Sequence, residues 1–208
     1  MRLSAVLTGQ PAPVAAKSGQ TGHFKRPRAG AVAVGPAGLE GDCIVDLEHH
    51  GGPDQAVYLF GDFDRAWWAE ALGHPVEPGF FGENLAIAGL TAAALALGDV
   101  LQIGAARLQI TAPRIPCATF AAVTGRKDAL ELFFASARPG AYARVLEGGR
   151  IEAGMKVTHL PFAGPRISVV EALEHVRAGR RSEDWARRVL RTPAHEKMRA
   201  EARAHLSI

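Results

Sequence analysis

Residues 100–117 read Val100-Leu101-Gln102-Ile103-Gly104-Ala105-Ala106-Arg107-Leu108-Gln109-Ile110-Thr111-Ala112-Pro113-Arg114-Ile115-Pro116-Cys117, and this stretch decides the fold class. Two short runs of strand-forming residues, 100–103 and 107–111, are separated by a glycine and followed by a loop that holds two prolines. Short strands with Gly and Pro turn signals between them favour a barrel or a sandwich over alternating strands and helices.

The same pattern extends over residues 1–161. Further runs that predict strands are residues 3–7, 31–34, 56–60, 142–146 and 155–157. Two short helices are expected within this region. One covers about 62–72, with Asp62 as its N-cap and Gly73 just past its end, and the other covers about 127–135. The sequence therefore predicts a mainly β, barrel-like fold with a few short helices.

After Pro161 the pattern changes to one typical of helices. Ser168 and Ser182 both look like helix starts, and Ser168 has capping-box spacing to Glu171. Thr192-Pro193 places proline at a first helical position, and apolar residues then recur every four positions from 194 to 206. We therefore expect a β domain over residues 1–163, followed by a small three-helix unit over residues 164–208.

Composition is ordinary for a globular protein: 48% of the 208 residues are hydrophobic and 22% are charged. No apolar run approaches the roughly 20 residues that a membrane helix needs, and the N-terminus lacks a signal-peptide pattern. We therefore expect no membrane association. The two cysteines, Cys43 and Cys117, have no disulfide-framework spacing, which favours a reducing cytoplasm.

The basic excess is confined to the C-terminal region. Residues 1–165 carry 14 Lys and Arg against 15 Asp and Glu, whereas residues 166–208 carry 10 against 6. The C-terminal region has no aromatic interleaving beyond Trp185, so nucleic acid is an improbable partner. A solvated helical face explains these charges equally well.

Cys117 follows Arg114 on a segment that Pro113 and Pro116 stiffen. A nearby guanidinium favours the thiolate, and the thiolate is the form that attacks carbon or binds a soft metal. A buried cysteine that acts as a small hydrophobe is the alternative.

Three other segments carry polar residues that could line a site. His50 precedes Gly51 and Gly52, which let backbone approach a ligand, although a glycine turn with a solvated His49-His50 pair fits too. Because adjacent residues of an extended chain point to opposite faces, His49 and His50 cannot both enter one site.

Glu83 and Asn84 either close a turn or line a pocket. The cations of Lys25-Arg26-Pro27-Arg28 form a solvated loop or bind a phosphate.

Five segments together resemble a MOSC domain, the module named for the C-terminal part of molybdenum-cofactor sulfurases, and most closely its YiiM-type branch. These segments are Thr21-Gly22-His23-Phe24-Lys25-Arg26-Pro27, Gly38-Leu39-Glu40-Gly41-Asp42, His50-Gly51-Gly52-Pro53-Asp54, Phe81-Gly82-Glu83-Asn84-Leu85 and Pro113-Arg114-Ile115-Pro116-Cys117. The helical C-terminal unit also resembles the unit that follows the domain in YiiM-type proteins. Arg28 departs from the family pattern, in which this position is Val.

The resemblance implies a β-rich fold that binds the molybdenum cofactor, Mo-molybdopterin, with Cys117 as both the catalytic residue and the protein ligand to the metal. Lys25, Arg114 and Arg144 would hold the phosphate or the pterin. The remaining cofactor-binding residues that it implies are His50, Gly51, Gly52, Asp54, Glu83 and Asn84.

The implied reaction is the two-electron reduction of small N-hydroxylated compounds such as hydroxylamino purines and amidoximes. No flavin, haem or iron–sulfur signature is present in the sequence, so the electrons would come from a separate reductase. A second hypothesis is a persulfide carrier or a cofactor-delivery protein, since both need a reactive thiolate. A third is a cofactor-free thiol hydrolase with His50 as the base.

Overall fold

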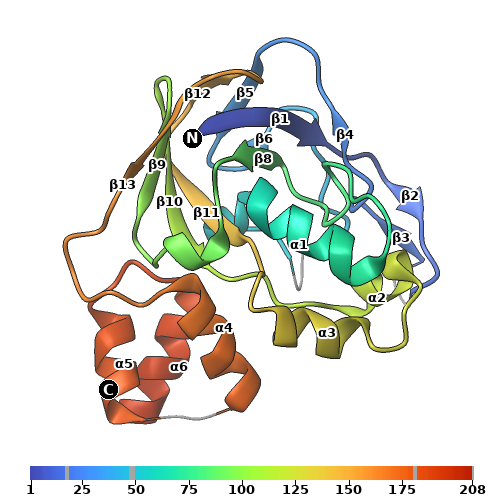
Figure 1. Cartoon of the computed structure of the whole chain (residues 1–208). Helices are drawn as coiled ribbons and strands as arrows, with labels where there is room; N and C mark the ends of the chain where they lie inside the picture. The colour runs from blue at the N-terminus through green and yellow to red at the C-terminus, as the bar shows by residue number, and fades with distance from the viewer. Residues whose placement is uncertain (17–18, 47–49, 180–181, 208) are drawn as a thin grey trace.

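The structure is a computed structural model that describes residues 1–16, 19–46, 50–179 and 182–207. A curved eight-stranded sheet dominates it, and three C-terminal helices pack against one end of that sheet (Figure 1). The strands of the main sheet, in spatial order, are β13 (Val157–Leu160), β9 (Val100–Ile103), β10 (Ala106–Ala112), β11 (Ala141–Glu147), β7 (Val57–Gly61), β8 (Leu85–Ala88), β1 (Arg2–Thr8) and β4 (Arg26–Pro27). The mainly β prediction is confirmed.

Every neighbouring pair in this sheet is antiparallel except β7 and β8, which run parallel. A parallel pair needs a long crossover connection, and the one between β7 and β8 holds helix α1 (Asp62–Leu72). Two smaller groups of strands complete the fold: β5 (Val32–Gly35) with β6 (Gly38–Leu39) and β12 (Gly149–Ile151), and β2 (Ala12–Pro13) with β3 (Gln20–Thr21).

The sheet curls until its two ends nearly meet. An isolated bridge between Arg2 and Lys156 connects β1 to the residue before β13. The Leu3 N–H also donates to the Met155 carbonyl at 2.9 Å. The sheet is therefore barrel-like, but it is not a continuously paired closed barrel, because β4 extends beyond β1 at one edge.

Strand β10 shows why the sequence folds this way. Its residues Ala106, Leu108 and Ile110 are fully buried, whereas Arg107 and Gln109 between them are partly exposed. This alternation places one face of the strand on the core and the other toward solvent. Strand β7 is buried on both faces, because Val57 and Leu59 enter the main core while Tyr58 and Phe60 enter a second apolar cluster.

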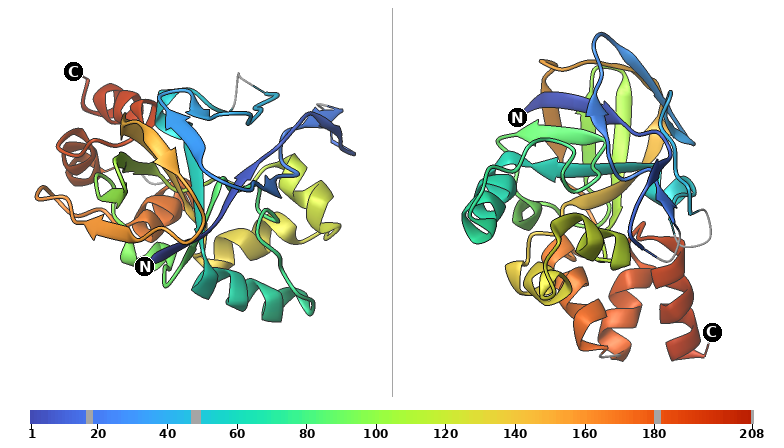
Figure 2. Two further views of the ribbon diagram at one scale, coloured as in Figure 1. Left: turned by 90° about the horizontal axis from the view of Figure 1, so that it is seen from above. Right: turned by 90° about the vertical axis from the view of Figure 1, so that its right-hand side faces the viewer.

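The second cluster lies beneath helices α1, α2 (Ala118–Thr124) and α3 (Ala129–Ser136). Trp68 of α1 packs against Phe120 of α2 and Phe133 of α3, with ring centroids 6.0 and 5.9 Å away. These contacts hold α2 against the outer face of the sheet (Figure 2). They thereby also position Cys117, the N-cap residue of α2.

The C-terminal helices are α4 (Val169–Ala178), α5 (Glu183–Leu190) and α6 (Glu196–Leu206). The predicted starts of α4 and α5 are confirmed: the Ser168 hydroxyl accepts the Glu171 N–H, and the Ser182 hydroxyl accepts the Trp185 N–H. Buried residues of all three helices belong to the same apolar cluster as the sheet. The division at residue 163 stays a prediction.

One predicted helix start is wrong; the predicted bounds of α1, 62–72, are confirmed, but its predicted N-cap is wrong. Helix α6 begins at Glu196 rather than at Pro193, because the His195 N–H donates to the Thr111 carbonyl at 2.9 Å and holds that segment extended. Helix α1 is capped by Gly61, and Asp62 instead accepts the Gly89 N–H at 2.9 Å. The predicted end of α1 at Gly73 is confirmed, since Gly73 has the left-handed conformation of a C-cap.

Several elements of the fold were not anticipated from the sequence: strand β8, helix α2, the short strands β2, β3, β4, β6 and β12, and the 3-10 helices. Two other predictions were displaced by about two residues, the strand at 155–157 and the helix at 127–135. None of the described helices has the length and apolar character needed to cross a bilayer.

Candidate functional site

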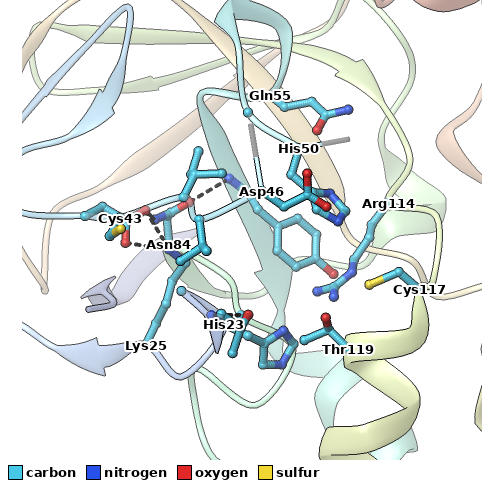
Figure 3. Close-up of a pocket in the computed structure, with 18 of the residues that line it drawn as sticks. His23, Lys25, Cys43, Asp46, His50, Gln55, Asn84, Arg114, Cys117 and Thr119 are labelled. Carbon is cyan, nitrogen blue, oxygen red and sulfur yellow. Dashed lines mark hydrogen bonds and ion pairs between the residues drawn. The ribbon is translucent and has the colours of Figure 1, made fainter. Parts of the chain in front are cut away.

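A pocket opens where strand β10 ends, between the loop that follows β10 and the loops that precede β4 and β7. The loop, residues 113–117, is hereafter called the cysteine arm. It runs from the end of β10 at Ala112 to Cys117, which occupies the N-cap position of α2. Figure 3 shows Cys117, Arg114 and His50 pointing toward one another across this pocket.

The thiol of Cys117 has a pKa of about 6, well below its ordinary value. Burial acts to raise this pKa, but a hydrogen bond with His50, the charge of Arg114 and the Phe120 N–H together outweigh it. Since Cys117 is half-buried and its pKa lies below 7, the thiolate predominates at neutral pH and is reachable from the pocket.

Arg114 is held almost entirely out of solvent, with 5% of its surface exposed. Its guanidinium donates to the Phe81 carbonyl and lies over the rings of Tyr58 and Phe120, at 5.1 and 5.7 Å from their centroids. Stacking and hydrogen bonding fix the direction of this cation. The positive charge therefore stays beside the Cys117 sulfur.

A second cation, Lys25, reaches the pocket from the opposite side. Its Nζ donates to both carboxylate oxygens of Asp42, at 2.5 and 2.6 Å. Asp42 also accepts from Asn84 Nδ2 at 2.8 Å and from the Gly9 N–H at 2.7 Å. Burial lowers the pKa of Lys25, and the Asp42 carboxylate opposes that shift. One wall of the pocket is therefore a hydrogen-bonded polar group made of Lys25, Asp42 and Asn84.

His23 contributes a neutral imidazole. Burial and the charges of Arg114 and Lys25 lower its pKa to about 3, and its Nε2 lies 2.8 Å from the Phe80 carbonyl. The ring is pressed against Gly82, where a Cβ would lie 2.8 Å from Nδ1. Gly82 also has a φ of 73°, so this position needs glycine for two independent reasons.

Two successive glycines follow His50. Gly51 and Gly52 have φ values of 82° and 77°, a conformation that L side chains rarely adopt. The chain turns sharply here and leads into the short 3-10 helix η1 (Pro53–Gln55). His49 and Glu48 lie outside the described residues, so the predicted opposition of the two histidines is not addressed by the structure.

The pocket brings together six of the residues that the sequence singled out: Lys25, His50, Gly51, Asn84, Arg114 and Cys117. Of the three cations in residues 25–28, it includes Lys25. Arg26 is exposed, and Arg28 Nη1 lies 3.3 Å from the Thr8 hydroxyl. The six residues that do line the pocket come from four segments far apart in the chain.

Four of the expected binding residues lie elsewhere. Glu83 has no exposed surface, and its carboxylate accepts from Arg65 Nη2 at 2.9 Å and from the N–H groups of Gly79 and Phe81. Of the two predicted roles, Glu83 therefore has the first: it closes a turn and does not line the pocket. Gly52 is exposed and lines a different hollow, which η1 and the start of α6 form.

Asp54 and Arg144 border that same hollow and bind each other at 2.9 Å. The second carboxylate oxygen of Asp54 accepts the Glu196 N–H at 2.7 Å, and Arg144 Nη2 donates to the Ala194 carbonyl at 3.0 Å. Both residues therefore connect the sheet to α6. In this position neither faces the Cys117 pocket.

Other pocket residues were not singled out from the sequence. They include His23, Asp42, Cys43, Gln55, Tyr58 and Tyr142. His23 and Asp42 lie inside two of the segments on which the family resemblance rests, so that resemblance offered a signal for them. Tyr58 and Tyr142 read as ordinary strand residues, and only the pairing of β7 with β11 brings them together.

The donor set suits an anionic group that carries a soft metal. Among the described residues, no three His, Cys, Asp or Glu side chains are grouped to hold a metal ion by themselves. Cys117 offers one soft thiolate ligand, while Arg114 and Lys25 offer buried positive charge. The pocket residues therefore fit a metal whose other ligands arrive with an organic, negatively charged cofactor.

Comparisons with known proteins match this chain to one family. The model of the MOSC domain matches residues 46–158. The protein YflK of Bacillus subtilis is 38% identical over 150 residues, which are 72% of this chain and 68% of YflK. A protein of Gibberella moniliformis named "Reductase" is 30% identical over 166 residues, which are 74% of this chain but 28% of that protein.

The crystal structure of YiiM from Geobacillus stearothermophilus has the same architecture. It superposes with a TM-score of 0.81 at 26% sequence identity, and the match covers 99% of this chain and 98% of that one. The similarity therefore includes the C-terminal helices as well as the sheet.

Proposed function

Because the chain belongs to the MOSC domain family, we propose that it binds the molybdenum cofactor around Cys117 and reduces N-hydroxylated compounds there. The observation that carries this proposal is the Cys117 thiol, whose pKa of about 6 makes it a thiolate beside the buried Arg114 guanidinium. The fungal relative named as a reductase supports the class of reaction.

In this proposal Cys117 holds the metal through its sulfur, since a thiolate is a soft ligand. Arg114 and Lys25 bind the anionic part of the cofactor, and Asp42 keeps Lys25 pointed into the pocket. His23, being neutral, offers a hydrogen bond without adding positive charge. Gly51 borders the pocket with backbone alone.

The bound cofactor would supply the two-electron chemistry, as cofactors do in such enzymes. The balance requires two electrons and two protons for each N–O bond that breaks, and it yields the amine (or amidine) and one water. We assign one proton to the His50 imidazole, which is hydrogen-bonded to Cys117 and faces the pocket. The electrons would come from a separate reductase, and a reducing cytoplasm would protect the Cys117 sulfur from oxidation.

The test is to express the protein in a host that makes the cofactor, measure its molybdenum content, and supply chemically reduced viologen with 6-hydroxylaminopurine or benzamidoxime. Cys117→Ser should lose both the molybdenum and the turnover, while its thermal stability stays within about 0.5 kcal/mol of the parent. Cys43→Ser is the matched control, because Cys43 lines the same pocket with its own free thiol and should keep both properties.

Molybdenum-loaded protein that turns over neither substrate would contradict the reductase proposal. Molybdenum retained by Cys117→Ser would contradict the role of Cys117 as ligand.

A sulfur carrier or cofactor-delivery protein is the second candidate, and the half-exposed thiolate favours it as well. Mass spectrometry of protein expressed with a cysteine desulfurase distinguishes the two. A carrier should show one added sulfur atom on Cys117, and the reductase should not.

A further inference from the structure

Two tyrosines, Tyr58 and Tyr142, line the Cys117 pocket side by side. They stand opposite each other on the antiparallel strands β7 and β11, and their rings lie 5.1 Å apart with an angle of 40° between the planes. Aromatic pairs of this kind across two strands stabilise a sheet. The two rings therefore share one structural role, and what distinguishes the two residues is the use of their hydroxyl groups.

The Tyr58 hydroxyl is satisfied inside the protein, whereas the Tyr142 hydroxyl is not. Tyr58 is buried and donates to the Pro139 carbonyl at 2.8 Å. The Tyr142 hydroxyl has no hydrogen-bond partner among the described residues, and it is also not one of their polar atoms that are buried without a partner. Since Tyr142 is half-buried and lines the pocket, its hydroxyl is open to a ligand there.

A β-bulge lies directly opposite Tyr142. The pairing of β10 with β11 shifts register between Ile110 and Ala112, which leaves Thr111 as the extra residue. Thr111 Oγ1 lies 2.6 Å from the Asp54 carbonyl and 3.1 Å from the Tyr142 carbonyl, so the bulge is held in place. Bulges re-aim side chains and recur next to active sites. This bulge fixes Tyr142 beside the point where β10 ends and the cysteine arm begins.

The proposed reduction needs two protons for each N–O bond, and His50 accounts for one of them. A tyrosine hydroxyl can act as a general acid and supply the other. Burial raises the pKa of Tyr142, although the Arg114 charge opposes that shift, so the hydroxyl keeps its proton at neutral pH. Thr119 also brings a hydroxyl to the pocket wall, but an aliphatic alcohol is a much weaker acid than a phenol.

We propose that the Tyr142 hydroxyl donates a hydrogen bond to the oxygen of the substrate's N–OH group and supplies the proton that leaves with that oxygen. This inference rests on the proposed reductase function. A hydroxylamino purine, R–NHOH, takes up two electrons and two protons and yields R–NH2 and water. The electrons come from the separate reductase, His50 gives its proton to the nitrogen, and Tyr142 regains its proton from solvent.

The first measurement is binding without turnover. Oxidised, molybdenum-loaded protein is titrated in a calorimeter with 6-hydroxylaminopurine and with adenine, which lacks the oxygen. The parent should bind 6-hydroxylaminopurine about three- to tenfold more tightly, the range that one hydrogen bond gives. Tyr142→Phe should lose most of this preference and keep its molybdenum. Tyr58→Phe is the matched control: it should keep the preference but unfold at a lower temperature, because the Pro139 carbonyl loses its donor.

The second measurement is turnover of 6-hydroxylaminopurine with reduced viologen. Tyr142→Phe should lower kcat about a hundredfold, the lower end of what a general acid contributes. A variant that keeps both the preference and the parental rate, or one that loses its molybdenum, would overturn this proposal and leave the reductase function standing. A parent that binds the two purines alike would overturn it too. A parent without turnover contradicts the reductase function instead, and the binding preference alone then decides whether Tyr142 contacts the oxygen.

Discussion

At the scale of single residues, the pKa of the Cys117 thiol lies well below its ordinary value. Its pKa of about 6 results from His50, Arg114 and the Phe120 N–H acting against burial. Because three groups on different segments contribute, the shift depends on the folded arrangement of the pocket. A short peptide with the same sequence as the cysteine arm would lack His50 and should have a thiol closer to its ordinary pKa.

The first prediction concerns the pH dependence of Cys117 alkylation. Iodoacetamide reacts with the thiolate, so in a Cys43→Ser background the rate should rise through a midpoint near pH 6 and then level off. His50→Gln should move this midpoint upward, since it removes a hydrogen bond that lowers the pKa. Thr119→Ser, a substitution in the same pocket wall, should leave it in place. A midpoint that ignores His50→Gln would contradict the assigned cause.

The second prediction concerns Glu83, which the sequence left between two roles. Glu83→Gln should destabilise the protein by about 3–5 kcal/mol, because it leaves the buried Arg65 without its counter-charge. Urea denaturation measures this change. Glu147→Gln, which breaks the exposed pair with Arg107, should cost less than about 1 kcal/mol. A stable Glu83→Gln protein that loses its cofactor would instead give Glu83 a place in binding.

At the scale of elements, the C-terminal helices begin where their side chains can cap them. The third prediction is that Ser168→Ala lowers stability by about 1 kcal/mol, because the Glu171 N–H loses its acceptor. Ser168→Thr keeps a hydroxyl at the same position and should retain most of the stability. Thermal unfolding of the two variants gives the comparison, and equal losses would mean that capping is not the cause.

The elements that sequence reasoning predicted well are those whose determinants are local. Alternating burial in β10 and the serine caps of α4 and α5 each depend on residues within a few positions of one another. The start of α6 depends instead on a bond from His195 to Thr111, which lies far back in the chain. No local pattern contains that information, so the helix start predicted at Pro193 came too early.

The same distinction holds for the site. Lys25, Arg114 and Cys117 stand in recognisable motifs and do meet in the pocket. Asp54 stands in an equally recognisable motif, but its carboxylate binds Arg144, 90 positions away, and the N–H of Glu196. Motifs marked which segments matter, whereas long-range pairing decided which side chain of each segment faces the pocket.

At the scale of the whole molecule, Asp54 connects the sheet to the helical unit. The fourth prediction is that Asp54→Asn weakens this junction by about 2 kcal/mol, since it replaces a carboxylate that accepts from Arg144 and from the start of α6. Thermal unfolding should show a lower midpoint, while the alkylation midpoint of Cys117 stays near pH 6.

Asp128→Asn is the matched control for that measurement, because Asp128 pairs with Arg126 on the surface and should leave the unfolding midpoint unchanged. A shifted alkylation midpoint in Asp54→Asn, without loss of stability, would show that Asp54 acts on the Cys117 pocket after all.

The placement of β1 has a consequence for how the chain emerges during synthesis. This strand is made before β8, one of its two partners, which lies about 80 residues further along, with Arg2 opposite Ala88. At about 5–20 residues per second, the ribosome needs roughly 4–17 seconds to reach that partner. Throughout that interval Leu3 and Val6 lack the β8 residues that they pair with in the folded protein, so the nascent chain exposes an apolar strand that a holding chaperone would recognise.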